Sequence, residues 1–177
     1  MLFYIIVIAG GILFLIFLIL LILKANKLKV MNLKIEAAEK DVTEILKEKY
    51  DKLNDINNIM KTKDREDLFK DIETLEIDKF NNIELNKELA KFDKIIVELT
   101  DYNKEIIFDA EEEESFDKLA KININRLAIE KYYNDNVSVF NKAIDNFPSN
   151  IIAKFKKYDE KDLFLNEKEE IFEILKK

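Results

Sequence analysis

The sequence predicts an all-α protein: an N-terminal transmembrane helix that runs into an antiparallel up-and-down bundle of three long helices, followed by short C-terminal helices. Three observations predict this class. The first 23 residues carry no charged side chain. The rest of the chain places apolar residues at spacings of three and four, the period of an amphipathic helix. Gly and Pro, which commonly mark turns, number only 2 and 1 among 177 residues.

Residues 1–23 are predicted to be a transmembrane anchor. A helix rises about 1.5 Å per residue, so this run is roughly 34 Å long and spans a hydrocarbon core of about 30 Å. A cleaved signal peptide would have basic residues before the apolar run and a small-residue cleavage site after it, and the sequence shows neither.

Lysines flank the predicted anchor on its C-terminal side. Before the first acidic residue, Glu36, come Lys24, Lys27, Lys29 and Lys34. Positive residues favour the cytoplasmic side, so we expect a single-pass protein with its N-terminus outside and its bundle in the cytoplasm. The same lysines are expected to contact the anionic headgroups of the lipid bilayer.

Residues 24–158 are predicted to form the helical bundle, and residues 159–177 a C-terminal extension with a short amphipathic helix. The first helix is expected to continue from the membrane to about Lys61, because its apolar stripe meets no Gly or Pro after the anchor. The polar residues 61–67 predict a turn, with Asp64 and Asp67 resembling a helix start. A second helix is then expected to carry the apolar stripe from Leu68 to Leu99.

The third helix is predicted to begin near Glu111, because a run of acidic residues suits the positive end of the helix dipole. It should stop before Pro148, which lacks an N–H group and disfavours helix at the preceding residue. A short turn is expected at residues 151–153. Asn166 and Glu169 then predict the cap of a last helix bearing four apolar residues: Ile171, Phe172, Ile174 and Leu175.

Composition excludes several classes of enzyme. The chain has no His and no Cys, so a Ser-His-Asp triad, a cysteine nucleophile and an ordinary zinc site are excluded. Both glycines lie in the anchor, so no glycine-rich phosphate loop can follow it. We therefore expect no cofactor and no metal. We also expect no nucleic-acid partner, since the net charge is −7 and the basic cluster lies against the membrane.

Three polar residues interrupt the apolar stripe of the third helix: Asn123, Arg126 and Glu130. Arg126 and Glu130 are four residues apart and can pair along the helix. One interpretation of this polar seam is a recognition or switch site inside the bundle. The other, which we favour on sequence, is a partly exposed pair where the helix overhangs its neighbours.

A second pattern repeats every seven residues. Tyr133 and Asn134 are followed by Phe140 and Asn141, and then by Phe147. The aromatic residues fall on one helix face and are most simply core residues. Asparagine is a poor residue for a helix interior, so each amide is expected to cap or to bond a neighbouring element.

Residues 132–153 resemble the C-terminal signature of the LemA family, in which two Y-N pairs precede F-P-x-N-x-I-A. The signature maps onto Tyr133, Asn134, Phe140, Asn141, Phe147, Pro148, Asn150, Ile152 and Ala153. The chain departs from the family pattern at Glu130, Asn54 and residues 154–158, which marks a divergent member. The resemblance implies a bacterial membrane protein with a helical-bundle domain and no attributed enzymatic activity.

Three hypotheses for function follow. The first is a non-enzymatic bundle that binds another protein, through residues 147–158 or through the terminal helix, although these apolar residues could equally fold back onto the bundle. The second is a membrane sensor or signalling component whose bundle switches state at the polar seam. The third is an enzyme, which would have to use Asp, Glu, Lys, Tyr, Ser or Thr. A homo-oligomer joined by coiled-coil contacts remains an open alternative for the partner.

Overall fold

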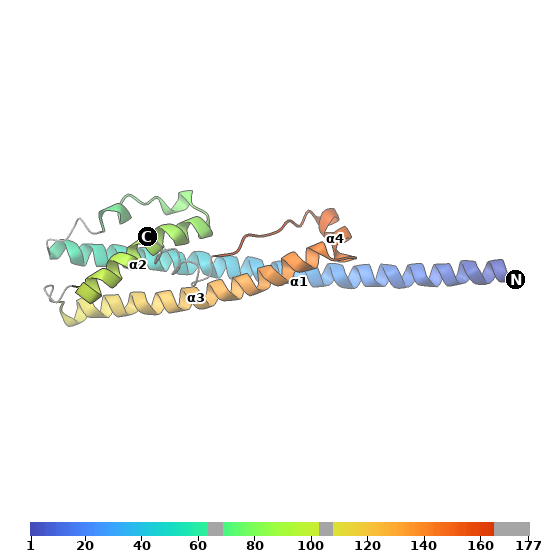
Figure 1. Ribbon diagram of the computed structural model, residues 1–177, viewed down its shortest axis with the longest axis horizontal. Helices are drawn as coiled ribbons and strands as arrows, with labels where there is room; N and C mark the ends of the chain where they lie inside the picture. The colour runs from blue at the N-terminus through green and yellow to red at the C-terminus, as the bar shows by residue number, and fades with distance from the viewer. Residues whose placement is uncertain (64–68, 103–107, 165–177) are drawn as a thin grey trace. The chain divides into compact units, whose positions relative to one another are not determined.

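The computed structural model describes residues 1–63, 69–102 and 108–164, and every regular element along them is a helix. The long helices are α1 (Leu2–Thr62), α2 (Asn82–Tyr102) and α3 (Ala110–Asp145), and the short helix is α4 (Ser149–Lys156) (Figure 1). Two 3₁₀ turns, η2 (Lys70–Ile72) and η3 (Ile77–Lys79), precede α2. The predicted all-α class, with three long helices and a short C-terminal one, is confirmed.

The chain divides into two compact units. The anchor unit comprises Met1–Ala37 with Tyr133–Lys177, and the bundle unit comprises Ala38–Tyr132. The domain boundaries predicted at residues 23 and 158 rest on changes in sequence composition, whereas the two compact units are defined by contacts in the fold. The predicted boundaries therefore stay a prediction.

Helix α1 is 61 residues long, and the predicted continuation to about Lys61 is confirmed. Along its first turns the apolar side chains are exposed, with Leu13 68% and Phe14 61% accessible. Helix α1 is long and apolar enough in this stretch to cross a membrane.

Within the bundle unit, the hydrogen bonds between helices fix their directions. Thr43 on α1 bonds Asn82 at the start of α2, and Lys49 on α1 bonds Asp93 further along α2, so α1 and α2 run the same way. Helix α3 runs opposite to α2, because Asn86 contacts Arg126 while Asp93 contacts the earlier Asn123. The up-and-down alternation therefore holds between α2 and α3 but not between α1 and α2.

The reason lies in residues 69–81, which were expected to form the first half of the second helix. That expectation is wrong, because this segment forms η2 and η3 and leads the chain back along α1. The amide of Asn57 donates to Glu73 at 2.6 Å near the far end of α1, whereas Asn82 lies beside Thr43. The apolar residues that were assigned to a helix, such as Ile72, are buried here in a 3₁₀ turn instead.

Capping residues determine where α2 and α3 begin. The Asn81 side-chain oxygen accepts the Glu84 N–H at 2.9 Å, and a Glu84 carboxylate oxygen accepts the Asn81 N–H at 3.1 Å. This reciprocal capping box satisfies two backbone donors that a helix start leaves unpaired. Asp109 and Glu112 make the same exchange at 2.9 and 2.8 Å before α3. The predicted start near Glu111 is confirmed, and the Asn81 box is the sequence signal that places the start of α2.

Helix α3 ends at Asp145, before Pro148, as predicted. The short turn expected at residues 151–153 is wrong, because these residues lie inside helix α4. Helix α4 ends at Lys156, and the next residue, Lys157, takes a left-handed conformation with φ of 55° while the Tyr158 N–H bonds the Ala153 carbonyl at 2.9 Å. This is the bonding of a Schellman cap, here made without glycine. The expected helix start at 64–67 and the terminal helix at 166–175 lie outside the described residues.

Each unit has its own apolar core. In the bundle unit the buried side chains come from α1, η2, α2 and α3: Val42, Leu46, Leu53, Ile56, Met60, Ile72, Leu85, Leu89, Phe92, Leu119 and Ile122. In the anchor unit they come from α1, α3, α4 and the segment after α4: Leu28, Ile35, Tyr133, Val137, Phe140, Ile144, Ala153 and Phe164. These sets follow the predicted apolar stripes and position two groups of polar residues.

Candidate functional site

The polar seam of α3 is buried in the bundle unit. Arg126 and Glu130 are each 5% exposed. One guanidinium nitrogen of Arg126, Nη1, donates to Glu130 Oε1 at 2.7 Å and to Asn86 Oδ1 on α2 at 2.8 Å. The favoured interpretation of a partly exposed pair is therefore wrong for these two side chains, because α2 lies against α3 where an overhang was expected.

The seam continues across α2 to α1. Lys49 is fully buried, and its ammonium group donates to Asp93 Oδ2 at 2.5 Å. The other Asp93 oxygen accepts the amide of Asn123 at 3.1 Å, so Asp93 links all three helices. Burial lowers the pKa of Lys49, and the opposite charge of Asp93 acts against that shift.

We call these six residues the polar cluster: Lys49, Asn86, Asp93, Asn123, Arg126 and Glu130. Lys49, Asn86 and Asp93 were missed from the sequence. The signal that marks them is the one used on α3, a polar residue at the three-four spacing of an apolar stripe. Lys49 falls between Leu46 and Leu53, for example.

The polar cluster balances its charges but not all of its hydrogen bonds. Two cations, Lys49 and Arg126, lie with two anions, Asp93 and Glu130. Within the described residues, Asn123 Oδ1 and Arg126 Nε are buried without a hydrogen-bond partner. An unsatisfied buried polar atom costs about 1–3 kcal/mol. The polar cluster therefore ties three helices together at a free-energy cost, which is the condition in which an alternative packing can compete.

The signature asparagines lie in the anchor unit, where both bond the main chain of an extended segment. We call this segment, residues 158–164, the strap. Asn134 donates to the Phe164 carbonyl at 3.1 Å and accepts the Phe164 N–H at 2.9 Å. Asn141 does the same with Lys161, at 2.9 and 3.1 Å. The prediction that each amide bonds a neighbouring element is confirmed.

The seven-residue repeat of the signature matches the geometry of the strap. Seven residues of helix rise about 10.5 Å, and three residues of extended chain span about 10 Å. Asn134 and Asn141 are thus as far apart as Phe164 and Lys161, and each amide meets one residue of the strap. The Tyr133 hydroxyl adds a bond to the Asp162 carbonyl at 3.2 Å.

The aromatic residues of the signature divide into two groups. Tyr133 and Phe140 are buried and make edge-to-face contacts with strap residues, Phe164 at 5.2 Å and Tyr158 at 5.6 Å between ring centroids. Such pairs contribute about 0.5–1.5 kcal/mol beyond the area they bury. Phe147 is 71% exposed, so its predicted core position is wrong. Because α3 ends at Asp145, Phe147 leaves the helical stripe that Tyr133 and Phe140 share.

The other signature residues shape the corner between α3 and α4. Pro148 directly precedes α4, and Ala153 packs in the core at 4% exposure. Asn150 and Ile152 are half-buried on α4. The membrane-flanking lysines Lys24, Lys27, Lys29 and Lys34 are all exposed on α1.

A carboxamide that bonds both the N–H and the C=O of one residue reads the main chain and is indifferent to the side chain. Along residues 1–63, 69–102 and 108–164 no group of three acidic side chains is placed to hold a metal ion.

Comparison with known proteins gives one match. The model of the LemA family matches residues 116–174, a range that includes the signature, α4 and the strap. No curated protein and no solved structure shows significant similarity to the chain. The family match and the signature coincide, and together they support assigning this chain to the LemA family.

Proposed function

We propose that this chain is a single-pass membrane protein that acts by binding another protein and catalyses no reaction. The observation that carries the proposal is the strap. Its contacts with Tyr133, Asn134 and Asn141 use the polar groups of the family signature on main-chain atoms. Bonding to an extended main chain is a common way for one polypeptide to recognise another. It is not an arrangement that polarises a substrate.

The proposed location is a bacterial cell membrane, with the N-terminus outside and the bundle in the cytoplasm. The apolar start of α1 and the LemA-family match support membrane association. Lys24, Lys27, Lys29 and Lys34 support the orientation, because they concentrate positive charge on one side of the span.

The proposed docking segment follows the strap. Phe164, the last bonded residue of the strap, is buried and hydrogen-bonded through both its N–H and its carbonyl. Residues 165–177 follow Phe164 in the sequence. Their sequence carries Ile171, Phe172, Ile174 and Leu175 among charged residues, the composition of an amphipathic helix that inserts into an apolar groove.

Photo-crosslinking in native membranes tests the proposal. A photoreactive amino acid at Phe172 of the full chain should capture a different polypeptide, and the same group at Ser115 on α3 should not. Replacing both strap asparagines, Asn134→Leu with Asn141→Leu, should weaken the capture, because the segment then begins from an unfixed point. Capture of only a second copy of the chain would contradict docking on another protein and favour a homo-oligomer.

The polar cluster favours a second candidate, a membrane sensor whose bundle switches state. Its buried charges and its buried atoms without hydrogen-bond partners cost free energy. This cost lowers the free-energy difference between the observed helix packing and a second packing of the same helices. The chain has no Cys, so spin labels at introduced Glu48→Cys and Lys121→Cys would report the distance between α1 and α3.

If the bundle switches between two states, the spin labels on α1 and α3 should show two separate distances. Replacing Asn123, Arg126 and Glu130 with Leu should leave only one of these distances. One unchanged distance in both proteins, with a difference only in thermal stability, would contradict the switch.

A further inference from the structure

We propose that helix α4 and the corner before it form a second membrane contact of the anchor unit. In this proposal Phe147, Ile151 and Phe155 insert into the bilayer, and an anionic lipid headgroup binds between Lys24 and Lys27. The proposal deepens the proposed function, since it requires α1 to span the bilayer.

Exposed apolar side chains gather at this corner. Phe147, Ile151 and Phe155 are 71%, 48% and 85% exposed and lie four residues apart in sequence. On α4 that spacing puts Ile151 and Phe155 on one face. The opposite side of α4 is packed, with Ser149 and Ala153 buried at 6% and 4%. Helix α4 thus presents an uncovered apolar face whose burial would remove large aromatic surfaces from water.

The stacking of Phe147 on α1 indicates what covers this face. The rings of Phe147 and Phe17 are stacked, with centroids 6.2 Å apart and planes at 19°. Phe17 lies seven residues before Lys24, roughly 10 Å along the helix. A ring stacked on Phe17 therefore lies within the hydrocarbon when α1 spans the membrane. Amphipathic helices bury their apolar faces about 5–10 Å into the same boundary region.

The charges around the corner match an anionic bilayer. Residues 142–157 contain four lysines and a single acidic residue, Asp145. Three of these lysines, Lys154, Lys156 and Lys157, lie on α4 or at its end. Lysines close to an anionic leaflet are attracted to its negative surface. An apolar face surrounded by lysines suits the surface of an anionic bilayer.

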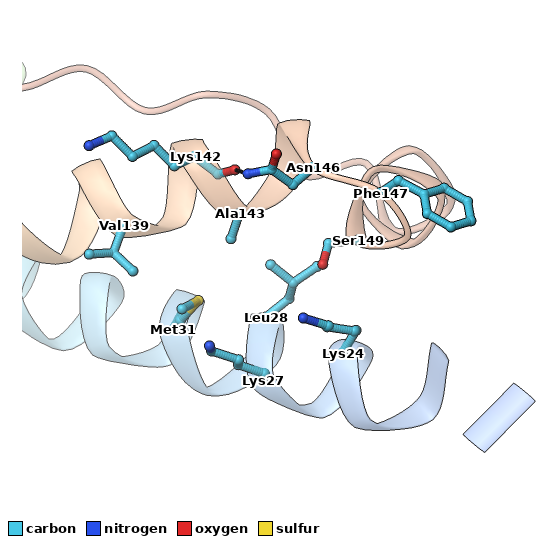
Figure 2. A pocket seen from close by; sticks show the side chains of 10 residues that line it. All are labelled: Lys24, Lys27, Leu28, Met31, Val139, Lys142, Ala143, Asn146, Phe147 and Ser149. Carbon is cyan, nitrogen blue, oxygen red and sulfur yellow. Dashed lines mark hydrogen bonds between the residues drawn. The ribbon is translucent and has the colours of Figure 1, made fainter. Parts of the chain in front are cut away.

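A cavity of about 260 Å³ lies between α1 and the α3–α4 corner, next to this face. Figure 2 shows the ammonium groups of Lys24 and Lys27 pointing the same way along α1, with Leu28 and Ser149 beside them, while Lys142 points away along α3. Apolar side chains of Met31, Val139 and Ala143 also line the cavity. Two ammonium groups beside an apolar lining suit the phosphate and the first acyl carbons of a phospholipid.

Tryptophan fluorescence tests the insertion, because the chain contains no Trp. Phe155→Trp in the full chain, reconstituted in liposomes, should give blue-shifted emission that brominated phosphatidylcholine quenches. Ile124→Trp is the matched control, since Ile124 is 66% exposed on α3 in the bundle unit and should show neither effect. Unquenched, water-like emission from Phe155→Trp would overturn the insertion.

Lipid binding tests the cavity. Native mass spectrometry should show phosphatidylglycerol retained in preference to phosphatidylcholine. Lys24→Gln with Lys27→Gln should reduce this preference at least tenfold. The control, Lys29→Gln with Lys34→Gln, removes the same charge from exposed positions that do not line the cavity and should keep the preference. If both double variants lose the preference for phosphatidylglycerol equally, the headgroup site is overturned. It is also overturned if inorganic phosphate competes as well as phosphatidylglycerol does.

Alkaline extraction of membranes separates this inference from the proposed function. If carbonate releases the chain from the membrane, α1 does not anchor it, and the proposed function is contradicted. A chain that stays in the membrane while Phe155→Trp remains unquenched contradicts the second contact alone.

Discussion

Removing the Asp93 carboxylate should strongly destabilise the bundle unit. Lys49 is fully buried, and it forms an ion pair with Asp93 at 2.5 Å. In Asp93→Ala the ammonium group would stay buried without the carboxylate that it bonds, and Asn123 would lose the oxygen that its amide bonds at 3.1 Å. Burial already lowers the pKa of Lys49, so the protein interior disfavours its charged ammonium form relative to the neutral amine.

The magnitude follows from the burial of Lys49, whose side chain is 0% exposed, while that of Asp93 is 27% exposed. Breaking a buried ion pair by removing one member costs about 3–5 kcal/mol. The surface pair of Lys52 and Asp55 has the same chemistry at 2.6 Å, with side chains 20% and 57% exposed. Exposed pairs contribute about 0.2–1 kcal/mol. For a chain of this size, each kcal/mol shifts Tm by about 2–4 °C. Asp93→Ala should therefore lower Tm by roughly 6–20 °C, and Asp55→Ala by at most about 4 °C.

Thermal and urea unfolding of the full chain in detergent micelles, followed by circular dichroism, measures both variants. A third protein, Lys49→Met with Asp93→Leu, replaces the buried pair by apolar groups and should recover stability to within about 1 kcal/mol of the original. Equal shifts for Asp93→Ala and Asp55→Ala would refute the reasoning, because burial would then make no difference. A double variant as unstable as Asp93→Ala would also refute it, by showing that packing volume matters more than charge.

Three further predictions follow from the same structure. Burial lowers the pKa of Lys49 below its usual 10.5, so between the two values the unfolded chain binds more protons than the folded chain. Stability should therefore rise with pH across that window, and Lys49→Met should flatten the slope in urea titrations. Arg126→Met alone should destabilise by about 3–5 kcal/mol and more than Arg126→Met with Glu130→Leu, because the single change removes the guanidinium that bonds the buried Glu130 carboxylate and keeps the carboxylate. Ser115→Cys should resist a membrane-impermeant maleimide in intact cells and react after lysis, and labelling before lysis would place the bundle outside.

Much of the fold follows from the period of the apolar residues. The 61 residues of α1 could be predicted because the stripe after the anchor meets no Gly or Pro. The start of α3 followed from acidic residues that cap it, and its end from Pro148. Residues 69–81 could not be predicted in the same way, since buried residues such as Ile72 keep a helix-like spacing in 3₁₀ turns. The Asn81–Glu84 box was visible in the sequence, but the apolar period that ran through it suggested an uninterrupted helix.

The candidate sites show a similar limit. Asn134 and Asn141 stood out because asparagine is costly inside a helix, and their need for a partner was predictable. The partner was not, because the strap contributes only main-chain atoms and leaves no pattern of side chains in the sequence. The seam on α3 was predictable from its spacing. Its burial was not, since it depends on Asn86 and Asp93 of α2, and the direction of α2 is determined by residues 69–81 before it.

The central claim is that the signature asparagines hold the strap through its main chain. Amide hydrogen exchange, followed by NMR on the full chain, tests this most directly, since the N–H groups of Lys161 and Phe164 both donate to asparagine oxygens. Both amides should be protected. Asn141→Leu should remove the protection at Lys161. Replacing Asn146, whose amide bonds the Lys142 carbonyl of α3 and no strap residue in the described part of the chain, by Asn146→Leu should leave that protection unchanged. Exchange of both amides at the rate of an unstructured chain in the original protein, or protection at Lys161 that survives Asn141→Leu, would contradict the account.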